Sequence, residues 1–352
     1  MRPFTTTTCD ISIGLDLGDR RSYLVALRRN GELVDERRIP TTPTGIRKYF
    51  EGREPVRVVV EAGGQSAWVS SLLTDLGHDV VVANPIAAGK LLKANGRKND
   101  RVDALSLAEY GFWNTRKLRP IRHRSRESQV DLMVLRARDS LVAQRTKAIN
   151  SVRSFAKMFG VRFKSCDADN FHQHVPSELP ADVRMGLQIT IDQIESLTKS
   201  IKAYDQRVRE LIKKHPKTNQ LRQVHGVGPI TALAFILILD DPKRFSRSRK
   251  VGSFLGLAPS EHSSGDSNPQ LRISKAGNPF LRRLLVTAAQ HILHRGPDCE
   301  LRRYGERLAV LGGKRGKKRA VVAIARKLSV LLHRLWDSGV PYDPEYAQAR
   351  TA

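Results

Sequence analysis

The stretch ISIGLDLGDRRSYLVALRRNGELVDERRIP, residues 11–40, decides the fold of the N-terminal part of this chain. It holds three successive apolar runs, and Asn30-Gly31 separates the second from the third. Asn-Gly between two such runs is the strongest short-range signal for a β-hairpin. We therefore predict three consecutive antiparallel strands, at residues 11–18, 22–29 and 32–40.

The sequence after these strands alternates between helix and strand. Residues 42–52 are expected to form a short helix. The run VRVVVEAGG at 56–64 is nearly continuous β-branched apolar sequence, which is typical of a strand buried on both faces. The order β-β-β-α-β-α-β-α predicts an α/β domain at residues 8–115. Its last elements are a helix at 66–77, a strand at 78–84 and helical sequence at 85–112 with a loop near Asn95-Gly96.

The rest of the chain is predicted to be mainly helical. Two charged stretches, 125–160 and 181–213, predict an antiparallel coiled-coil hairpin over 125–213, with a loop between its helices. Its simplest role is that of a spacer or dimerisation arm. Residues 221–340 predict a mostly helical third domain. The second hairpin helix repeats apolar side chains at three- and four-residue steps: Leu187, Ile191, Ile194, Leu197, Ile201 and Tyr204.

The charge of the chain indicates a polyanionic partner. Lys and Arg number 61 and Asp and Glu 35, a formal net charge of +26. Nucleic acid is the first expectation, because basic side chains release counterions from phosphates; an anionic membrane surface is the competing one. No apolar run reaches the roughly 18 residues of a membrane span, and the N-terminus lacks the apolar core of a signal peptide. We expect a cytoplasmic protein, nucleoid-associated when acting.

The three cysteines add no metal or disulfide framework. Cys9, Cys166 and Cys299 are odd in number and far apart. Their spacing fits neither paired disulfides nor a zinc site. A reducing compartment is therefore expected.

Four acidic residues form the candidate metal site. Asp16 stands in the first predicted strand, and Glu61 ends the buried one. Asp100 and Asp103 are three residues apart, so on a helix they share a face. A carboxylate in an apolar strand is costly unless it is paired, and Mg²⁺ supplies such pairing through oxygen ligands. If they converge, the four can hold Mg²⁺; taken singly, each also fits a structural role.

These residues carry a resemblance to a known family. In order and spacing, Asp16, Glu61, Asp100 and Asp103 resemble the DEDD tetrad of a family of insertion-sequence transposases. The family includes the Piv/MooV DNA invertases and the RNA-guided bridge recombinases. The resemblance implies a RuvC-like, ribonuclease-H-like N-terminal domain and a serine-bearing C-terminal domain. It extends over HGVGPITALA (225–234), FLGLAPSEHSSG (254–265) and RISKAGNPFLRRLL (272–285).

The same resemblance implies a nucleophilic serine. The family places it immediately before a glycine, which here is Ser264 before Gly265. Ser263 stays open as an alternative, and Ser267 is the weaker candidate. Serine is a poor nucleophile at its own pKa and needs a base, a metal or a charged setting. We interpret His262 as structural or phosphate-contacting, and expect the metal domain of the same or another protomer to activate the serine.

Basic residues after the serine block are the candidate nucleic-acid contacts. Those close to the serine can hold the scissile phosphate or anchor the backbone. The run GGKRGKKR at 312–319 indicates backbone binding without sequence readout. Gly226 and Gly228 can let backbone N–H groups approach a phosphate, although this motif alone is weak. The basic candidates are Arg272, Lys275, Arg282, Arg283, Lys314, Arg315, Lys317, Lys318 and Arg319.

The resemblance also implies the partners. Donor and target DNA duplexes, a structured guide RNA and a homo-oligomer organised as a dimer of dimers are expected from the family. We see no zinc finger or homeodomain, which is compatible with sequence reading by base pairing. Strand transfer by transesterification conserves bond energy, and the chain has no GxxxxGK[ST] phosphate loop for ATP.

Three hypotheses follow. In the first, a recombinase uses both the tetrad and Ser264, with Mg²⁺ as cofactor. In the second, a metal-dependent junction-resolving nuclease uses water, and Ser264 is a loop residue. In the third, the carboxylates are structural and the protein only binds nucleic acid. A covalent protein–DNA adduct on Ser264 separates the first from the second.

Overall fold

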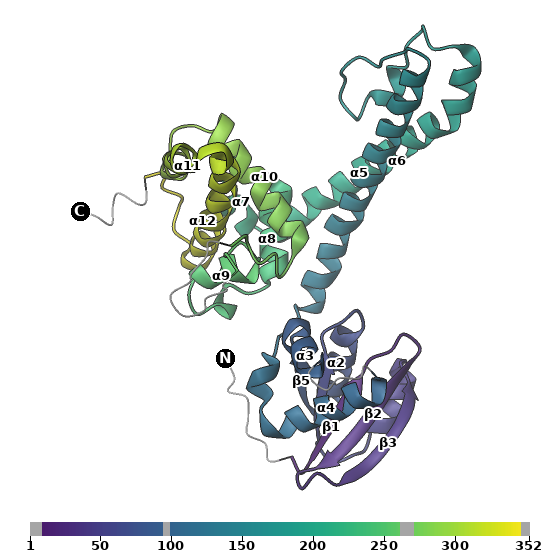
Figure 1. Ribbon diagram of the computed structural model, residues 1–352, viewed down its shortest axis with the longest axis vertical. Helices are drawn as coiled ribbons and strands as arrows, with labels where there is room; N and C mark the ends of the chain where they lie inside the picture. Colours follow the sequence, from purple (N-terminus) through teal and green to yellow (C-terminus); the bar gives the residue numbers. More distant parts are fainter. Residues whose placement is uncertain (1–8, 94–98, 261–270, 346–352) are drawn as a thin grey trace. The chain divides into compact units, whose positions relative to one another are not determined.

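The computed structural model describes residues 9–93, 99–260 and 271–345. Contacts along the chain group it into two compact units, residues 1–123 and 124–352 (Figure 1). Residues 125–213 and 221–340 fall in the same unit, and the division into three domains stays a prediction. Within the described ranges, no helix is both long and apolar enough to cross a bilayer.

The first unit is built on one five-stranded sheet of order β3-β2-β1-β4-β5. β1, β2 and β3 are antiparallel neighbours, whereas β1, β4 and β5 run parallel. The mixed α/β class is therefore confirmed. The elements are β1 Ile11–Asp16, β2 Arg21–Arg28, β3 Leu33–Pro40, α1 Pro43–Phe50, β4 Arg57–Glu61, α2 Ser66–Asp75, β5 Asp79–Ala83, α3 Pro85–Lys93, α4 Asp100–Trp113 and the 3-10 turn η1 Thr115–Leu118.

Local chemistry accounts for these elements. Gly31 has φ +88° between β2 and β3, the left-handed conformation that the Asn-Gly turn supplies. Val58, Val59 and Val60 are fully buried, so the prediction that β4 is covered on both faces is confirmed. α1 begins after Thr42, whose side chain accepts a hydrogen bond from the Gly45 N–H. The predicted loop near Asn95-Gly96 lies outside the described residues.

Helix α4 lies directly on the sheet because two glycines allow it. A Cβ placed on Gly14 of β1 would stand 1.8 Å from the carbonyl oxygen of Ala104. A Cβ on Gly111 of α4 would stand 2.1 Å from the hydroxyl oxygen of Ser12. That hydroxyl donates to the carbonyl of Ala108 at 2.7 Å. Because neither glycine has a side chain, the backbone of α4 can pack directly against β1.

The second unit begins with a long helical hairpin, as predicted. Helices α5 Arg126–Met158 and α6 Ala181–Lys214 run side by side (Figure 1). The segment between them is irregular apart from the turn η2 Phe171–Gln173. The fully buried Phe171 stacks on Phe163, with ring centroids 4.8 Å apart, and closes this end of the hairpin. Four of the six predicted periodic residues are buried: Leu187, Ile191, Ile194 and Ile201.

The other end of the hairpin is fastened by the carboxylate of Asp131, whose side chain is only 7% exposed. Its Oδ2 lies 2.8 Å from Nζ of Lys214 and 2.8 Å from Nε2 of His215. Burial raises the pKa of Asp131, but the hydrogen bonds from Lys214 and His215 outweigh it and leave the pKa below its ordinary value.

Replacing Asp131 with asparagine should therefore destabilise the second unit at neutral pH, by about 2 kcal/mol. A carboxyl whose pKa is lowered by folding contributes stability above its unfolded pKa and loses it as the pH falls through the folded pKa. The difference in the free energy of unfolding between wild type and Asp131→Asn, measured in urea, should thus be largest at pH 7. It should shrink as the pH falls below the ordinary pKa range of Asp. A difference that is constant with pH would contradict the role of the charge.

The C-terminal helices pack around α8, whose residues from Thr231 to Leu239 are all buried. α10 and α12 contribute apolar faces to the same core, together with part of α5. The described residues of 221–340 are mostly helical, as predicted. The elements are α7 Lys217–Leu221, α8 Pro229–Leu239, η3 Pro242–Arg244, α9 Arg249–Phe254, α10 Pro279–Arg295, α11 Glu300–Leu311, η4 Gly313–Arg315 and α12 Gly316–Ser338.

Candidate active site

Asp16 and Glu61 end neighbouring parallel strands. Asp16 is the last residue of β1 and Glu61 the last of β4. The register pairs Leu15 with Val60, so the two acidic residues come next to each other at the carboxyl edge of the sheet. Both are partly buried. The sheet therefore brings two of the four predicted residues together, although 44 positions of sequence separate them.

Both residues stand on the sheet face that α4 covers. Side chains two apart on a strand share a face, and Ser12 and Gly14 of β1 both touch α4. Ser12 meets the helix near Ala108, whereas Gly14, further along β1, meets it at Ala104. The helix thus runs opposite to β1. Asp16 lies two residues beyond Gly14 on β1, and so it comes to the level of the first turn of α4.

The first turn of α4 carries the other two predicted residues. The helix begins at Asp100, with Asn99 as its cap, so the helical placement of Asp100 and Asp103 is confirmed. Their surroundings differ. Asp103 is buried at 9% exposure, whereas the Asp100 side chain is 63% exposed. Asp100 lies 3.5 Å from the guanidinium of Arg38 on β3. The turn therefore presents one carboxylate towards the sheet and one at its rim.

The donor set fits a hard divalent cation. Every candidate ligand is a carboxylate oxygen, the ligand type that Mg²⁺ takes in proteins. Across the described ranges, however, no three Asp, Glu, His or Cys side chains are arranged as a metal site. The backbone positions converge on one edge, and the carboxylate groups would have to turn towards a shared cation.

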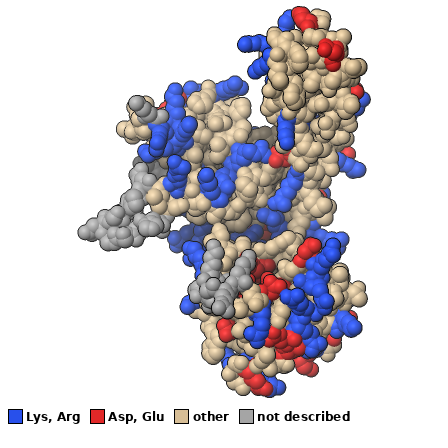
Figure 2. Space-filling model, turned by 45° about the vertical axis from the view of Figure 1, so that its right-hand side comes forward, with Lys and Arg blue, Asp and Glu red and all other residues tan. Residues whose placement is uncertain are grey.

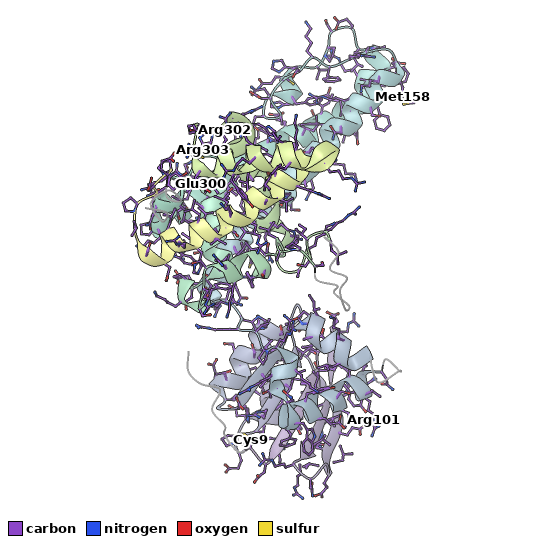
Figure 3. The ribbon with its side chains drawn as sticks, turned by 60° about the vertical axis from the view of Figure 1, so that its left-hand side comes forward. Cys9, Arg101, Met158, Glu300, Arg302 and Arg303 are labelled. Atoms are coloured by element: carbon purple, nitrogen blue, oxygen red, sulfur yellow. The ribbon has the colours of Figure 1, made fainter. Side chains whose placement is uncertain are left out.

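A hydrogen-bonded network that the sequence did not reveal holds the start of α4. Arg101, labelled in Figure 3, donates to Oε1 of Glu36 at 2.7 Å, and the hydroxyl of Tyr23 donates to the same oxygen at 2.5 Å. Tyr23 pairs with Asp16 across β1 and β2. The bonds from Arg101 and Tyr23 lower the pKa of Glu36, while the bond to Glu36 raises the pKa of Tyr23. Sequence spacing gave no signal for this network, because its members lie on three elements.

Two further residues organise the loops at the carboxyl edge. Nε2 of Gln65 donates to the carbonyls of Gly18 and Asp19, at 3.1 and 3.0 Å. It thereby ties the turn after Asp16 to the start of α2, which follows Glu61. Nε2 of His123 lies 3.1 Å from the hydroxyl of Ser66, the first residue of α2. Asp19 itself lies in the turn between β1 and β2.

In the second unit, the chain stretches on either side of the serines pair with each other through backbone hydrogen bonds. Ser263, Ser264, Ser267 and His262 lie within 261–270, outside the described residues. On either side the chain forms a bridge between Pro259 and Ile273. The Ser260 N–H donates to the Arg272 carbonyl at 2.9 Å, and the Ser274 N–H to the Ala258 carbonyl at 2.9 Å. The chain therefore enters and leaves the segment with the predicted nucleophile through two paired stretches, residues 258–260 and 272–274, which we call the neck.

The two chain segments that continue from the neck pack tightly against each other. Cβ atoms on Gly256 and Gly277 would stand 2.1 and 1.9 Å from backbone carbonyl oxygens of the opposing segment. Lys275 has φ +54°, an uncommon conformation for a residue with a side chain. Nη1 of Arg282 donates to the carbonyls of Leu255 and Ala276, both at 2.9 Å. One arginine thus joins the two sides of the neck.

The remaining basic candidates are mostly on the surface. Arg272 and Lys275 are exposed at the neck, and Arg283 pairs with Asp139 of α5. The glycines of GGKRG make the turn from α11 to α12, since a Cβ on Gly316 would stand 2.2 Å from the Ala309 carbonyl oxygen. The side chain of Lys314 lies outside the described part of the structure. Figure 2 shows basic side chains over the helices of the second unit as well as over the first. Around that turn the exposed side chains are Arg315, Lys317, Lys318 and Arg319.

The HGVG motif is a packing turn. Gly226 has φ +78°, and a Cβ there would stand 2.8 Å from the Ala288 carbonyl oxygen of α10. Gly228 caps α8 at its N-terminus. Close approach to α10 accounts for the first glycine, and the helix start accounts for the second.

Comparison with known proteins decides the family. Residues 13–159 match a family model for DEDD transposases of the IS110 type, described as "Transposase". Residues 218–304 match a second model, described as "Transposase IS116/IS110/IS902 family". The chain belongs to this family of transposases. The resemblance drawn from the four acidic residues and the serine block is therefore confirmed.

Curated relatives of this transposase chain cover most of its length. A transposase for insertion sequence element IS1111A of Coxiella burnetii is 29% identical over 338 residues, 93% of this chain and 90% of the relative. A putative transposase of Sinorhizobium fredii is 28% identical over 309 residues, 87% and 79% of the two chains. A pilin gene-inverting protein of Moraxella lacunata is 25% identical over 308 residues, 85% of each chain. The relatives thus include both transposases and a gene-inverting protein.

Proposed function

We propose that this transposase exchanges DNA strands through a covalent phosphoserine intermediate on Ser264, with the DEDD carboxylates as its metal site. The observation that supports the metal site is the arrangement at the sheet edge. Asp16 and Glu61 end adjacent strands on the face under α4, and the first turn of α4 reaches the same level. In this proposal the first unit is a RuvC-like domain and the second comprises a coiled coil and a serine-bearing domain.

Asp16, Glu61, Asp100 and Asp103 would hold Mg²⁺. When bound, Mg²⁺ stabilises negative charge on phosphate oxygens and lowers the pKa of an attacking hydroxyl. Gln65 keeps the loops after Asp16 and Glu61 together, and the Arg101–Glu36 pair fixes the start of α4. These contacts orient the backbone that carries the carboxylates.

The covalent step balances without an external energy source. Oγ of Ser264 attacks the phosphorus of a DNA phosphodiester, a serine–phosphate bond forms, and the bond from phosphorus to the leaving sugar oxygen breaks. The leaving oxygen takes up a proton and becomes a free hydroxyl. In the second step a sugar hydroxyl from the other DNA partner attacks the phosphoserine, and the serine regains its proton. The number of phosphodiester bonds is unchanged, so no ATP is needed.

The basic residues divide into three tasks in this proposal. Arg272 and Lys275, exposed at the neck of the serine block, contact the scissile region of the backbone. Arg282 holds the two sides of the neck and so positions the block. The exposed side chains around the α11–α12 turn, with Lys314, anchor more distant phosphates.

The partners follow from the same function. Donor and target DNA duplexes are the substrates, a structured guide RNA reads their sequence, and four protomers, as a dimer of dimers, serve the four strands. The net charge of +26 supports a polyanionic partner. The long hairpin of α5 and α6 offers a surface for assembly.

A test for the covalent intermediate is direct. Wild-type protein incubated with DNA of the element ends should form an adduct that survives denaturation, and a peptide from it should carry the nucleotide on Ser264. Ser264→Ala should abolish the adduct and recombination together, whereas Ser263→Ala should retain some of both. Strand cleavage by Ser264→Ala without an adduct would instead support a water-using nuclease. Cleavage that persists in EDTA would contradict both enzymatic readings.

A further inference from the structure

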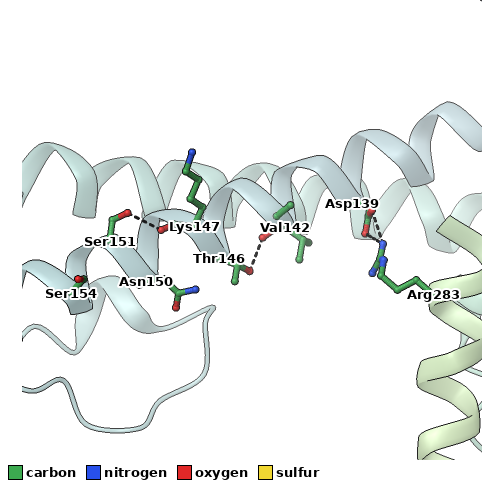
Figure 4. A pocket seen from close by; sticks show the side chains of 9 residues that line it. Asp139, Val142, Thr146, Lys147, Asn150, Ser151, Ser154 and Arg283 are labelled. Atoms are coloured by element: carbon green, nitrogen blue, oxygen red, sulfur yellow. Dashed lines mark hydrogen bonds and ion pairs between the residues drawn. The ribbon is translucent and has the colours of Figure 1, made fainter. Parts of the chain in front are cut away.

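A groove of about 750 Å³ runs along α5 in the second unit and ends at α10 (Figure 4). Its α5 side extends from Asp139 to Ser154, about 22 Å at 1.5 Å per residue. Lys147, Asn150 and Ser154 stand along it, and Arg283 enters from α10. Among the described lining residues the single carboxylate is that of Asp139. The lining therefore combines apolar surface, which makes up most of it, with two basic groups, Lys147 and Arg283, and one acidic group.

That one acidic group is bound to Arg283. Nη2 of Arg283 lies 2.5 Å from Oδ1 and 2.6 Å from Oδ2 of Asp139. The guanidinium also lies 5.5 Å from the centre of the Phe280 ring, which orients it. Both partners are partly exposed, at 55% for Arg283 and 37% for Asp139. An ion pair so open to water contributes at most about 1 kcal/mol, so another anion can displace the carboxylate at little cost.

We propose that this groove binds a nucleic-acid backbone and that Asp139 occupies the position of one of its phosphates until nucleic acid arrives. A phosphate matches the carboxylate in charge and geometry towards a guanidinium. The other donors along α5 are a cation, an amide and a hydroxyl, the usual partners of phosphate and sugar oxygens. The net charge of +26 makes a polyanion the occupant that the chain as a whole attracts.

The groove is joined to the serine block through α10. Arg283 follows Arg282, whose guanidinium holds both sides of the neck. A phosphate seated on Arg283 would thus lie one residue along α10 from the side chain that positions the block. The proposal rests on the proposed function only in taking nucleic acid as the ligand.

The test uses the full-length chain carrying Ser264→Ala, so that strand chemistry cannot contribute. Binding of a fluorescent DNA duplex and of a fluorescent RNA hairpin is measured across a range of KCl concentrations. Asp139→Asn should tighten binding of at least one probe about two- to fivefold. It should also steepen the slope of log affinity against log salt by about 0.7–0.9, the contribution of one phosphate. The probe that responds identifies the source of the backbone.

Glu195→Gln is the matched control. Glu195 pairs with Lys199 on α6, its side chain is 40% exposed, and its replacement changes the net charge by the same amount. Equal effects of Asp139→Asn and Glu195→Gln would overturn the proposal, because the gain would then reflect net charge alone. Unchanged binding of both probes in Asp139→Asn would overturn it as well.

Two further variants localise the effect. Arg283→Gln should weaken binding, and in that background Asp139→Asn should bring no gain. A gain that persists without Arg283 would contradict the exchange of carboxylate for phosphate. A photo-crosslinking residue at position 150 should label the bound probe; labelling only another protein chain would show a protein-docking surface instead. Because none of these measurements needs strand exchange, their outcome is independent of the adduct test.

Discussion

Asp16→Asn is expected to abolish strand exchange, with a loss of at least about a thousandfold. That loss corresponds to about 4 kcal/mol of transition-state stabilisation, within the several kcal/mol that a bound metal supplies. Asparagine keeps the size of the side chain but removes the charge that a hard cation requires. The variant should remain folded, because Asp16 is at the end of β1 and only partly buried. Recombination of element DNA and far-UV circular dichroism measure the two effects.

A second readout separates loss of the metal from loss of contact with DNA. Thermal unfolding of the wild type should shift upwards with added Mg²⁺ or Mn²⁺, and Asp16→Asn should lose this shift. Asp75→Asn is the matched control, because Asp75 is exposed at the far end of α2 from the carboxyl edge. It should retain both the shift and strand exchange. Full activity of Asp16→Asn would remove the metal site from the proposed function.

Gly14→Ala should destabilise the first unit by about 3 kcal/mol or more. The added Cβ would stand 1.8 Å from the Ala104 carbonyl oxygen and 2.6 Å from the Ala108 nitrogen, both of them backbone atoms. Neither can rotate away, so α4 must move as a body, which exceeds the usual cost of overpacking. The movement would also carry Asp103 away from Asp16. Urea unfolding followed by circular dichroism measures the loss.

Gly89→Ala provides the control in the same unit. Gly89 lies within α3, and a Cβ there meets nothing within 4 Å. Alanine is the better helix former, so this variant should be neutral or more stable by up to about 1 kcal/mol. Equal losses for the two variants would mean that glycine flexibility, and not close contact with α4, explains Gly14.

Much of the fold follows from local sequence. The Asn30-Gly31 turn, the valine run of β4 and the apolar steps of α6 each predicted the element that forms. Periodicity and turn chemistry act within a few residues, so they can be read without the partner element. The tight packing of α4 was not predictable in this way, because Gly14 matters only once Ala104 lies above it.

For the candidate site, the sequence supplied the residues but not their environments. Asp100 and Asp103 are three apart on one helix, yet one is exposed beside Arg38 and the other buried. Tyr23, Glu36 and Arg101 gave no motif at all, and neither did Gln65. Their contacts join separate strands and helices, and such contacts depend on sheet order and helix placement. The pair of Asp139 and Arg283, 144 residues apart, is of the same kind.

The chemistry of this protein can be read from its residues: acidic residues in strand settings, a serine block, a strongly basic chain and the family that these residues indicate. Which of those groups become neighbours depends on how the elements pack. Parallel pairing of β1 with β4 sets Asp16 beside Glu61, and a glycine-lined contact sets the first turn of α4 at their level. Propensity and charge belong to single residues, whereas proximity between distant residues arises only when strands pair and helices pack.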